Sequence, residues 1–119
     1  MMLDLKYIMK RIDALIPSLK RSQVIESILK AGAPGVTLVE SRGKGDGERP
    51  LIGGARGTAR YIAGYNRIDT ITTVVDESKL DSVVSAIMDS SHTGKSGDGF
   101  IFVSDVEQAY KIGTKEKIH

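Results

Sequence analysis

Residues 93–103 read TGKSGDGFIFV, and this stretch carries the most information about the fold of the chain. Three glycines among small polar residues predict a tight turn, and the apolar, β-branched and aromatic residues that follow predict a strand. A glycine-rich turn that leads into a strand exposes consecutive backbone N–H groups, which form a concavity suited to phosphate oxygens. An ordinary connecting loop has the same composition. The rest of the chain has to decide between these two interpretations.

The composition excludes several classes of protein. The 119 residues are enough for one domain, and 40% apolar with 27% charged residues is typical of a soluble globular protein. There is no cysteine and there are only two histidines, His92 and His119, so we expect no disulfide, no thiol nucleophile and no metal site. With 17 basic and 15 acidic residues, the net charge of +2 is too balanced to indicate a nucleic-acid binder. No signal peptide or apolar run of about 20 residues is present, which predicts a cytoplasmic protein without membrane insertion.

The hydrophobic pattern predicts two similar halves. In chain order the predicted elements are a strand over 7–16, a helix over 18–31, a strand over 35–41, a strand over 67–75, a helix that ends near residue 88, a strand over 100–103 and a short tail strand over 109–112. The predicted helix caps are Ser18 or Ser22 for the first helix and Asp76 or Ser78, together with Asp81, for the second. Gly32 stands where the end of the first helix favours a positive φ.

This order of elements predicts an α+β fold of the ferredoxin-like, split βαβ type. The sheet is expected to be antiparallel, with both helices on one face and the second and fourth strands at opposite edges. The other face then needs a cover, and a second copy of the chain supplies one. Residues 43–64 join the two halves and hold seven of the thirteen glycines. A connection of this length inside a small domain usually has a function.

Familiar catalytic and nucleotide motifs do not fit. The Gly94-Lys95-Ser96 triplet lacks the earlier glycine of a P-loop and runs from helix to strand, and residues 43–47 lack the third glycine of a dinucleotide fingerprint. His92 directly follows Ser91, and such neighbours seldom form a catalytic dyad. No catalytic residue is therefore predicted. A binding function remains. We expect a phosphate cleft between chains that brings together the glycine segments 43–47 and 93–99. Its candidate cations are Lys44, Lys95 and Lys111. Lys95 is more simply a solvated surface charge.

The same residues resemble a known family. Residues 93–99 followed by Ile101-Phe102-Val103 resemble the B-loop signature of the PII nitrogen-regulatory signalling proteins. Residues 9–14, MKRIDA, are similar to the opening strand of that family, and 36–39, VTLV, with 43–45, GKG, are similar to its second strand and the start of its T-loop. The resemblance divides a single domain over 1–119 into an N-terminal extension (1–8), a T-loop (43–66), a B-loop (92–99) and a C-terminal segment (107–119).

The resemblance implies a ferredoxin-like homotrimer that is not an enzyme. ATP and ADP would compete for three clefts between chains, and the T-loop would dock onto a target such as an ammonium transporter or a metabolic enzyme of nitrogen metabolism. Carried over by position, the nucleotide-binding residues are Thr37 and Val74 near the adenine, Gly43, Lys44 and Gly45 at the T-loop base, Thr93, Gly97, Asp98, Gly99 and Phe100 in and after the B-loop, and Lys111 from the adjacent chain.

Several positions depart from the family pattern. Phe100 stands where the family usually has a lysine on the phosphates, and Lys111 and Gly113 stand where it usually has two arginines. We therefore expect a weakened preference for ATP, with ADP or AMP bound comparably or better. Asp46-Gly47 replaces an Arg-Gln pair of which the glutamine helps to hold magnesium with 2-oxoglutarate. This departure weakens the case for classical sensing of 2-oxoglutarate with magnesium.

The long loop carries the residues expected to meet a partner or effector, which are Asp46, Arg49, Arg56, Arg60 and Tyr61. Its arginines are suited to another anion or to an acidic partner. Tyr61 lies near the modified tyrosine of the family, but Arg60 competes for that alignment, so no modification is predicted. Three alternatives stay open: a related sensor of a different small anion such as bicarbonate, a small nucleotide-processing enzyme, and a purely structural oligomer.

Overall fold

The computed structural model describes residues 8–44, 51–53, 60–62 and 66–119, with side chains described for 8–44 and 67–119. The strands are β1 (Met9–Pro17), β2 (Thr37–Gly43), β3 (Leu51–Gly53), β4 (Arg60–Ile62), β5 (Asn66–Asp76), β6 (Phe100–Asp105), β7 (Tyr110–Lys111) and β8 (Glu116–Lys117). The helices are α1 (Arg21–Lys30) and α2 (Leu80–Ser91), and each follows a short 3-10 turn, Ser18–Lys20 and Glu77–Lys79.

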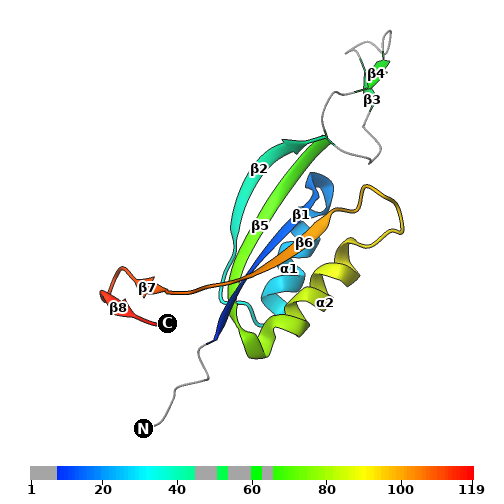
Figure 1. The fold of residues 1–119 in the computed structure, drawn as a ribbon. Coiled ribbons are helices and arrows are strands. Elements are labelled where there is room, and N and C mark those ends of the chain that lie inside the picture. Colours follow the sequence, from blue (N-terminus) through cyan, green and yellow to red (C-terminus); the bar gives the residue numbers. More distant parts are fainter. Residues whose placement is uncertain (1–7, 45–50, 54–59, 63–65) are drawn as a thin grey trace.

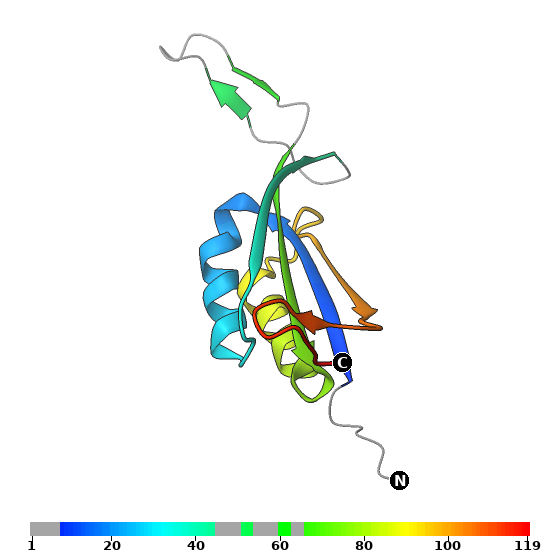
Figure 2. The same ribbon diagram turned by 90° about the vertical axis from the view of Figure 1, so that its left-hand side faces the viewer.

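Four strands form one antiparallel sheet in the order β2-β5-β1-β6. Both helices lie side by side on one face of this sheet (Figures 1 and 2). This is the predicted ferredoxin-like arrangement, and β2 and β6 lie at opposite edges as expected. Because neighbouring strands run in opposite directions, the end of β2, the start of β5 and the start of β6 all meet at the same end of the sheet.

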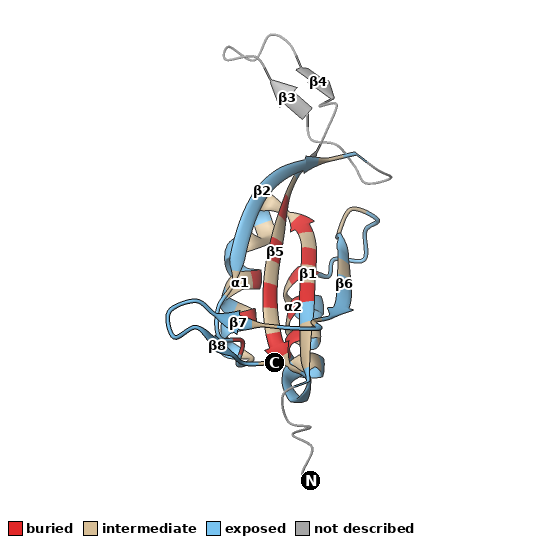
Figure 3. Ribbon diagram, turned by 60° about the vertical axis from the view of Figure 1, so that its left-hand side comes forward, coloured by how far each residue is buried: buried red, intermediate tan, exposed pale blue. Residues whose placement is uncertain are grey.

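The core lies between the sheet and the helices. Along β1, Ile12, Ala14 and Ile16 are buried while the residues between them are not, which is the period of a strand with one covered face. Figure 3 shows the same alternation of buried residues along β1 and β5. The buried apolar residues are Ile12, Ala14, Ile16, Val24, Ile28, Ala33, Ile71, Val75, Val83 and Ile87. The core is therefore aliphatic, as the scarcity of aromatic residues predicts.

The other face of the sheet has no cover within the described part of the chain. Leu15 faces this side because its neighbours Ala14 and Ile16 face the helices, and the register places it opposite Phe100. Phe100 and Phe102 are 67% and 54% exposed, and their rings stack with centroids 5.9 Å apart and planes 13° apart. We call this side the open face. It presents large apolar side chains to solvent, which a single chain seldom tolerates.

The predicted caps of α1 and α2 are wrong, although Asp76 is the N-cap residue of the 3-10 turn before α2, without a side-chain cap hydrogen bond. Each helix starts after a 3-10 turn, so its N-cap residue is a lysine, Lys20 or Lys79, which has no side-chain acceptor, and neither cap makes a side-chain hydrogen bond. Ser18 Oγ donates instead to Asp69 Oδ1 at 2.9 Å, and Ser78 Oγ donates to Asp76 Oδ2 at 3.2 Å. Gly32 does adopt the predicted positive φ, at 103°.

Two regions hold more strand than predicted. β3 pairs with β4 inside the segment predicted as a continuous loop, and β7 pairs with β8 where a single tail strand was expected. The β7–β8 hairpin turns through Lys115, whose φ of 59° is unusual for a residue other than glycine. A short pairing of this kind leaves little periodic signal in a sequence, because two or three residues do not establish an alternation.

Among the described glycines, Gly99 makes the closest approach to another part of the backbone. It lies where the B-loop meets β6, its φ is +110°, and a Cβ atom at this position would lie 1.9 Å from the carbonyl oxygen of Leu15. Real Cβ atoms do not come this close to backbone. Only glycine therefore lets β6 begin at this point, and the position of the B-loop depends on it.

Replacing Gly99 by alanine is expected to destabilise the fold by more than about 3 kcal/mol, because a backbone clash adds to the cost of the positive φ. Gly94→Ala is the matched control, since Gly94 also has a positive φ (+87°) but nothing within 4 Å of the added atom. That control should lose only about 1 kcal/mol. Urea unfolding of both variants measures the difference, and equal losses would contradict the clash.

Candidate functional site

The B-loop connects α2 to β6 and is built around the carboxylate of Asp98. The backbone N–H of Thr93 donates to Asp98 Oδ2 at 2.7 Å, and the N–H of Gly94 donates to the same oxygen at 2.9 Å. The hydroxyl of Thr93 donates to Asp98 Oδ1. The backbone N–H of Asp98 in turn donates to the carbonyl oxygen of Lys95 at 3.2 Å. These bonds close residues 93–98 into a ring.

This ring decides which backbone groups a phosphate could reach. The sequence predicts a run of exposed N–H groups, but those of Thr93 and Gly94 are bound by Asp98. In the part of the chain that the structure describes, the N–H groups of Ser96 and Gly97 make no hydrogen bond within the chain. The loop therefore keeps two adjacent donors at its tip, which is the minimum of an anion-binding nest.

The environment of Asp98 favours its charged form. The hydrogen bond from the Thr93 hydroxyl, followed by the backbone N–H of Thr93, lowers the pKa of Asp98 from its ordinary value of 3.8. The imidazole of His92, whose Nδ1 lies 3.7 Å from Asp98 Oδ2, acts in the same direction when it is protonated. Asp98 was predicted to hold phosphate and ribose. Its carboxylate already holds the loop, so its nucleotide contact stays a prediction.

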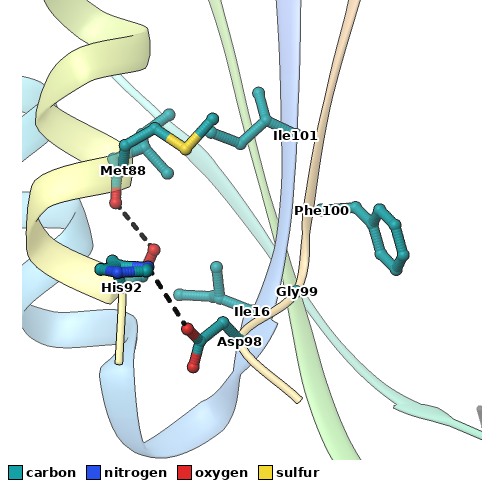
Figure 4. A pocket seen from close by; sticks show the side chains of 9 residues that line it. Ile16, Met88, His92, Asp98, Gly99, Phe100 and Ile101 are labelled. Carbon is teal, nitrogen blue, oxygen red and sulfur yellow. Dashed lines mark hydrogen bonds and ion pairs between the residues drawn. The ribbon is translucent and has the colours of Figure 1, made fainter. Parts of the chain in front are cut away.

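A small cavity of about 180 Å³ lies beneath the B-loop, on the helix side of β6. Ile16, Ile87, Met88 and His92 contribute to its lining (Figure 4). The ring of Phe100 points away from it, on the far side of β6 (Figure 4). Ligand pockets usually have about 300 Å³ or more, so this cavity is too small for a nucleotide.

The second part of the candidate site is the root of the T-loop, where β2 ends and β5 begins. Gly43 is the last residue of β2 and lies opposite Asn66. A Cβ atom on Gly43 would lie 3.0 Å from Ile68 Cγ1, so a larger residue would have to displace that side chain. Lys44 follows and is exposed. The expected adenine neighbours, Thr37 and Val74, lie on the open face farther along the same two strands.

The structure brings some predicted site residues together and keeps others apart. The T-loop root, on β2 and β5, lies at the same end of the sheet as the B-loop, and β1 separates β5 from β6. Lys111 lies in β7, away from the B-loop (Figures 1 and 2). Arg60 and Tyr61 belong to β4. Gly45, Asp46, Arg49 and Arg56 lie outside the described residues.

Sequence reasoning missed one charged group near the T-loop root. Asp69 in β5 is 1% exposed, and its carboxylate accepts bonds from Ser18 Oγ at 2.9 Å and from Arg21 Nη1 at 3.2 Å. A signal was present, because Asp69 alternates with Ile71 and therefore occupies a core-facing position of a strand. An aspartate at such a position needs partners, and the sequence does not say which residues supply them.

Two kinds of feature are absent from the described residues. None of their helices is long and apolar enough to cross a membrane. No group of three or more His, Cys, Asp or Glu side chains among them could hold a metal ion.

The fold and its two glycine-bearing loops define a ferredoxin-like α+β domain with its candidate site at one end of the sheet. Residues 9–116 match the family described as nitrogen regulatory protein P-II. Three similar proteins bear that name: one from Azospirillum brasilense is 35% identical, one from Pasteurella multocida is 38% identical and one from Nostoc punctiforme is 35% identical, each over 92% of this chain and 96% of the relative. The chain belongs to the P-II family. Its role is regulatory signal transduction in nitrogen control.

Asp98→Asn should loosen the B-loop, because the amide that replaces the carboxylate is a weaker acceptor for the Thr93 and Gly94 donors. The folded state lowers the pKa of Asp98, so the stability that it contributes is present above the unfolded pKa and is lost as the pH falls through the folded pKa. Urea unfolding should therefore separate the variant from the parent near neutral pH, and the two should converge as the pH falls through the folded pKa of Asp98, which lies below its ordinary value of 3.8. Glu107→Gln, at an exposed position, is the control. A difference that persists unchanged in acid would contradict this account.

Proposed function

We propose that the chain binds adenine nucleotides in clefts between the subunits of a homotrimer and regulates a target of nitrogen metabolism through its T-loop. The observation that supports this most strongly is the placement of the two loops. They lie at the same end of the sheet, and β1 separates β5 of the T-loop root from β6 of the B-loop. A neighbouring copy that packs beside the first would place its own loop there.

The phosphate contacts follow from the B-loop. The N–H groups of Ser96 and Gly97 supply donors without a partner in the described chain, and Lys44 at the T-loop root and Lys111 from a neighbouring copy supply cations. Phe100 supplies none, because a phenylalanine side chain carries no charge. Hydrogen bonds to charged groups contribute about 1.5–3 kcal/mol each, so a missing cation weakens the binding of a triphosphate more than the binding of a diphosphate.

Self-association follows from the open face. Phe100, Phe102 and Val39 are each more than half exposed on this side of the sheet, at 67%, 54% and 53%. Burial of apolar surface contributes about 25 cal/mol per Å², so covering these side chains would supply favourable free energy for association. A second copy of the chain presents the same apolar surface and is therefore a suitable cover.

Signalling requires that a ligand stabilises one arrangement of the T-loop over another. Contacts at the loop root, near Gly43 and Lys44, would favour one arrangement, and the loop would then bind or release a transporter or a metabolic enzyme. The protein would act as a binding module and not as an enzyme, with AMP a further candidate ligand. Asp46, at the position of a family arginine, should repel a dicarboxylate. This acidic residue favours a different small effector, such as bicarbonate, over 2-oxoglutarate with magnesium.

Calorimetry with ATP, ADP and AMP is expected to show binding of all three, with ATP less than about tenfold tighter than ADP. Introducing the missing cation with Phe100→Lys should shift the preference toward ATP, since the added ammonium would lie near the phosphates. Lys30→Gln also changes the net charge by one unit, but on the outer surface of α1, and it should leave the order of nucleotide affinities unchanged. A parent protein that binds ATP more than tenfold tighter than ADP would contradict the role given to Phe100.

Sedimentation analysis is expected to find a trimer for the parent protein. Phe102→Asp places a charge on the open face and should shift the protein toward monomer, because an unpaired carboxylate in an apolar interface is strongly unfavourable. Leu19→Asp is the control, since Leu19 is 99% exposed on the first 3-10 turn. A trimer that survives Phe102→Asp but not Leu19→Asp would show that the interface is elsewhere.

A further inference from the structure

The ladder between β2 and β5 contains two pairs of like charges next to each other. Glu40 lies directly opposite Asp69, and Arg42 lies directly opposite Arg67. Residues two apart in a strand point to the same side, so all four side chains project to the helix side of the sheet. Like charges directly opposite each other destabilise a strand pair. Each pair therefore needs a group of opposite charge.

The acidic pair has such a group within the chain. Arg21, the first residue of α1, donates from Nη1 to Glu40 Oε1 at 3.1 Å and to Asp69 Oδ2 at 3.2 Å. One guanidinium thus bridges both carboxylates. Ser18 adds a further donor to Asp69, which is buried and could not remain charged without partners.

The basic pair has no such group. Arg42 and Arg67 are both exposed, and neither makes an ion pair or a side-chain hydrogen bond with any described residue. They form the second-to-last pair of the β2–β5 ladder at the root of the T-loop, next to the terminal pair of Gly43 and Asn66. Two arginines on directly opposed residues of one face can bring their guanidinium groups to the oxygens of the same carboxylate or phosphate, to which arginine donates in bidentate fashion.

We propose that Arg42 and Arg67 form a two-arginine site for an oxyanion, a carboxylate or a phosphate group, that bridges them as Arg21 bridges the acidic pair. The site is separate from the residues assigned to adenine, because Thr37 and Val74 lie on the open face and the two arginines on the helix side. An oxyanion there ties together the two strands from which the T-loop leaves. Its occupancy therefore acts on the loop root independently of nucleotide.

The experiment follows the arginine Nε–Hε resonances by NMR in the full chain without nucleotide. Inorganic phosphate and succinate are added separately, with chloride holding the ionic strength constant. Both the Arg42 and the Arg67 signals should shift together and saturate. Arg67→Gln should weaken binding by about tenfold, because one charged bidentate partner is lost. Arg42→Gln tests the same contact from the other strand, and Lys30→Gln, which removes a charge elsewhere, should leave the affinity unchanged.

A parallel titration with a short oligoglutamate peptide identifies the source of the oxyanion. Tighter binding of phosphate or succinate indicates a free anion, and tighter binding of the peptide indicates an acidic segment of a protein partner. Either result supports the site if the Arg42 and Arg67 variants lose the binding. No coupled shift with any of the three probes, or equal affinity for the parent and both arginine variants, would overturn the proposal. Because nucleotide is absent throughout, a failure to bind ATP has no bearing on the result.

Discussion

The close contact of Gly99 with the backbone of Leu15 is the constraint on which the site depends. A Cβ atom there would overlap the carbonyl oxygen of Leu15, so β6 can begin at Phe100 only if the residue before it is glycine. This contact fixes where the chain leaves the B-loop, and Asp98 then folds the loop back onto Thr93 and Gly94. The edge strand and the candidate phosphate nest are therefore positioned by one backbone approach. The glycines of the B-loop differ in this respect: Gly99 is required because a Cβ atom there would clash with backbone, whereas a Cβ atom on Gly94 would meet nothing within 4 Å.

The fold could be predicted from the sequence because its signals are local and repeated. Residues 67–75 alternate between covered and open sides, and the two halves repeat strand, helix and strand, so the element order allowed few topologies. The B-loop was found for the same reason, since its residues are contiguous. The helix starts differ from the prediction because a 3-10 turn precedes each helix, and because the hydroxyls of Ser18 and Ser78 donate to Asp69 and Asp76.

The arrangement around Asp69 could not be predicted, because it joins residues that are far apart in the chain. Arg21 and Asp69 are 48 positions apart, and only the register of the sheet places Glu40 within reach of the same guanidinium. The bonds of the Thr93 and Gly94 N–H groups in the B-loop could not be predicted either. Composition predicts that the loop has donors, but only the fold of the loop shows which of them Asp98 has already bound. Pairings of this kind are geometric facts that a linear pattern does not contain.

The two edges of the sheet differ in how they are guarded against unwanted pairing. β2 carries Glu40 and Arg42, and such charges discourage another strand from docking alongside. β6 reads FIFVSD, and its first charged residue is its last, Asp105. A short apolar, β-rich segment without charge or proline, at a free edge, is typical of an aggregation hazard. A cover over β6 would therefore protect the chain against strand-to-strand aggregation at this edge.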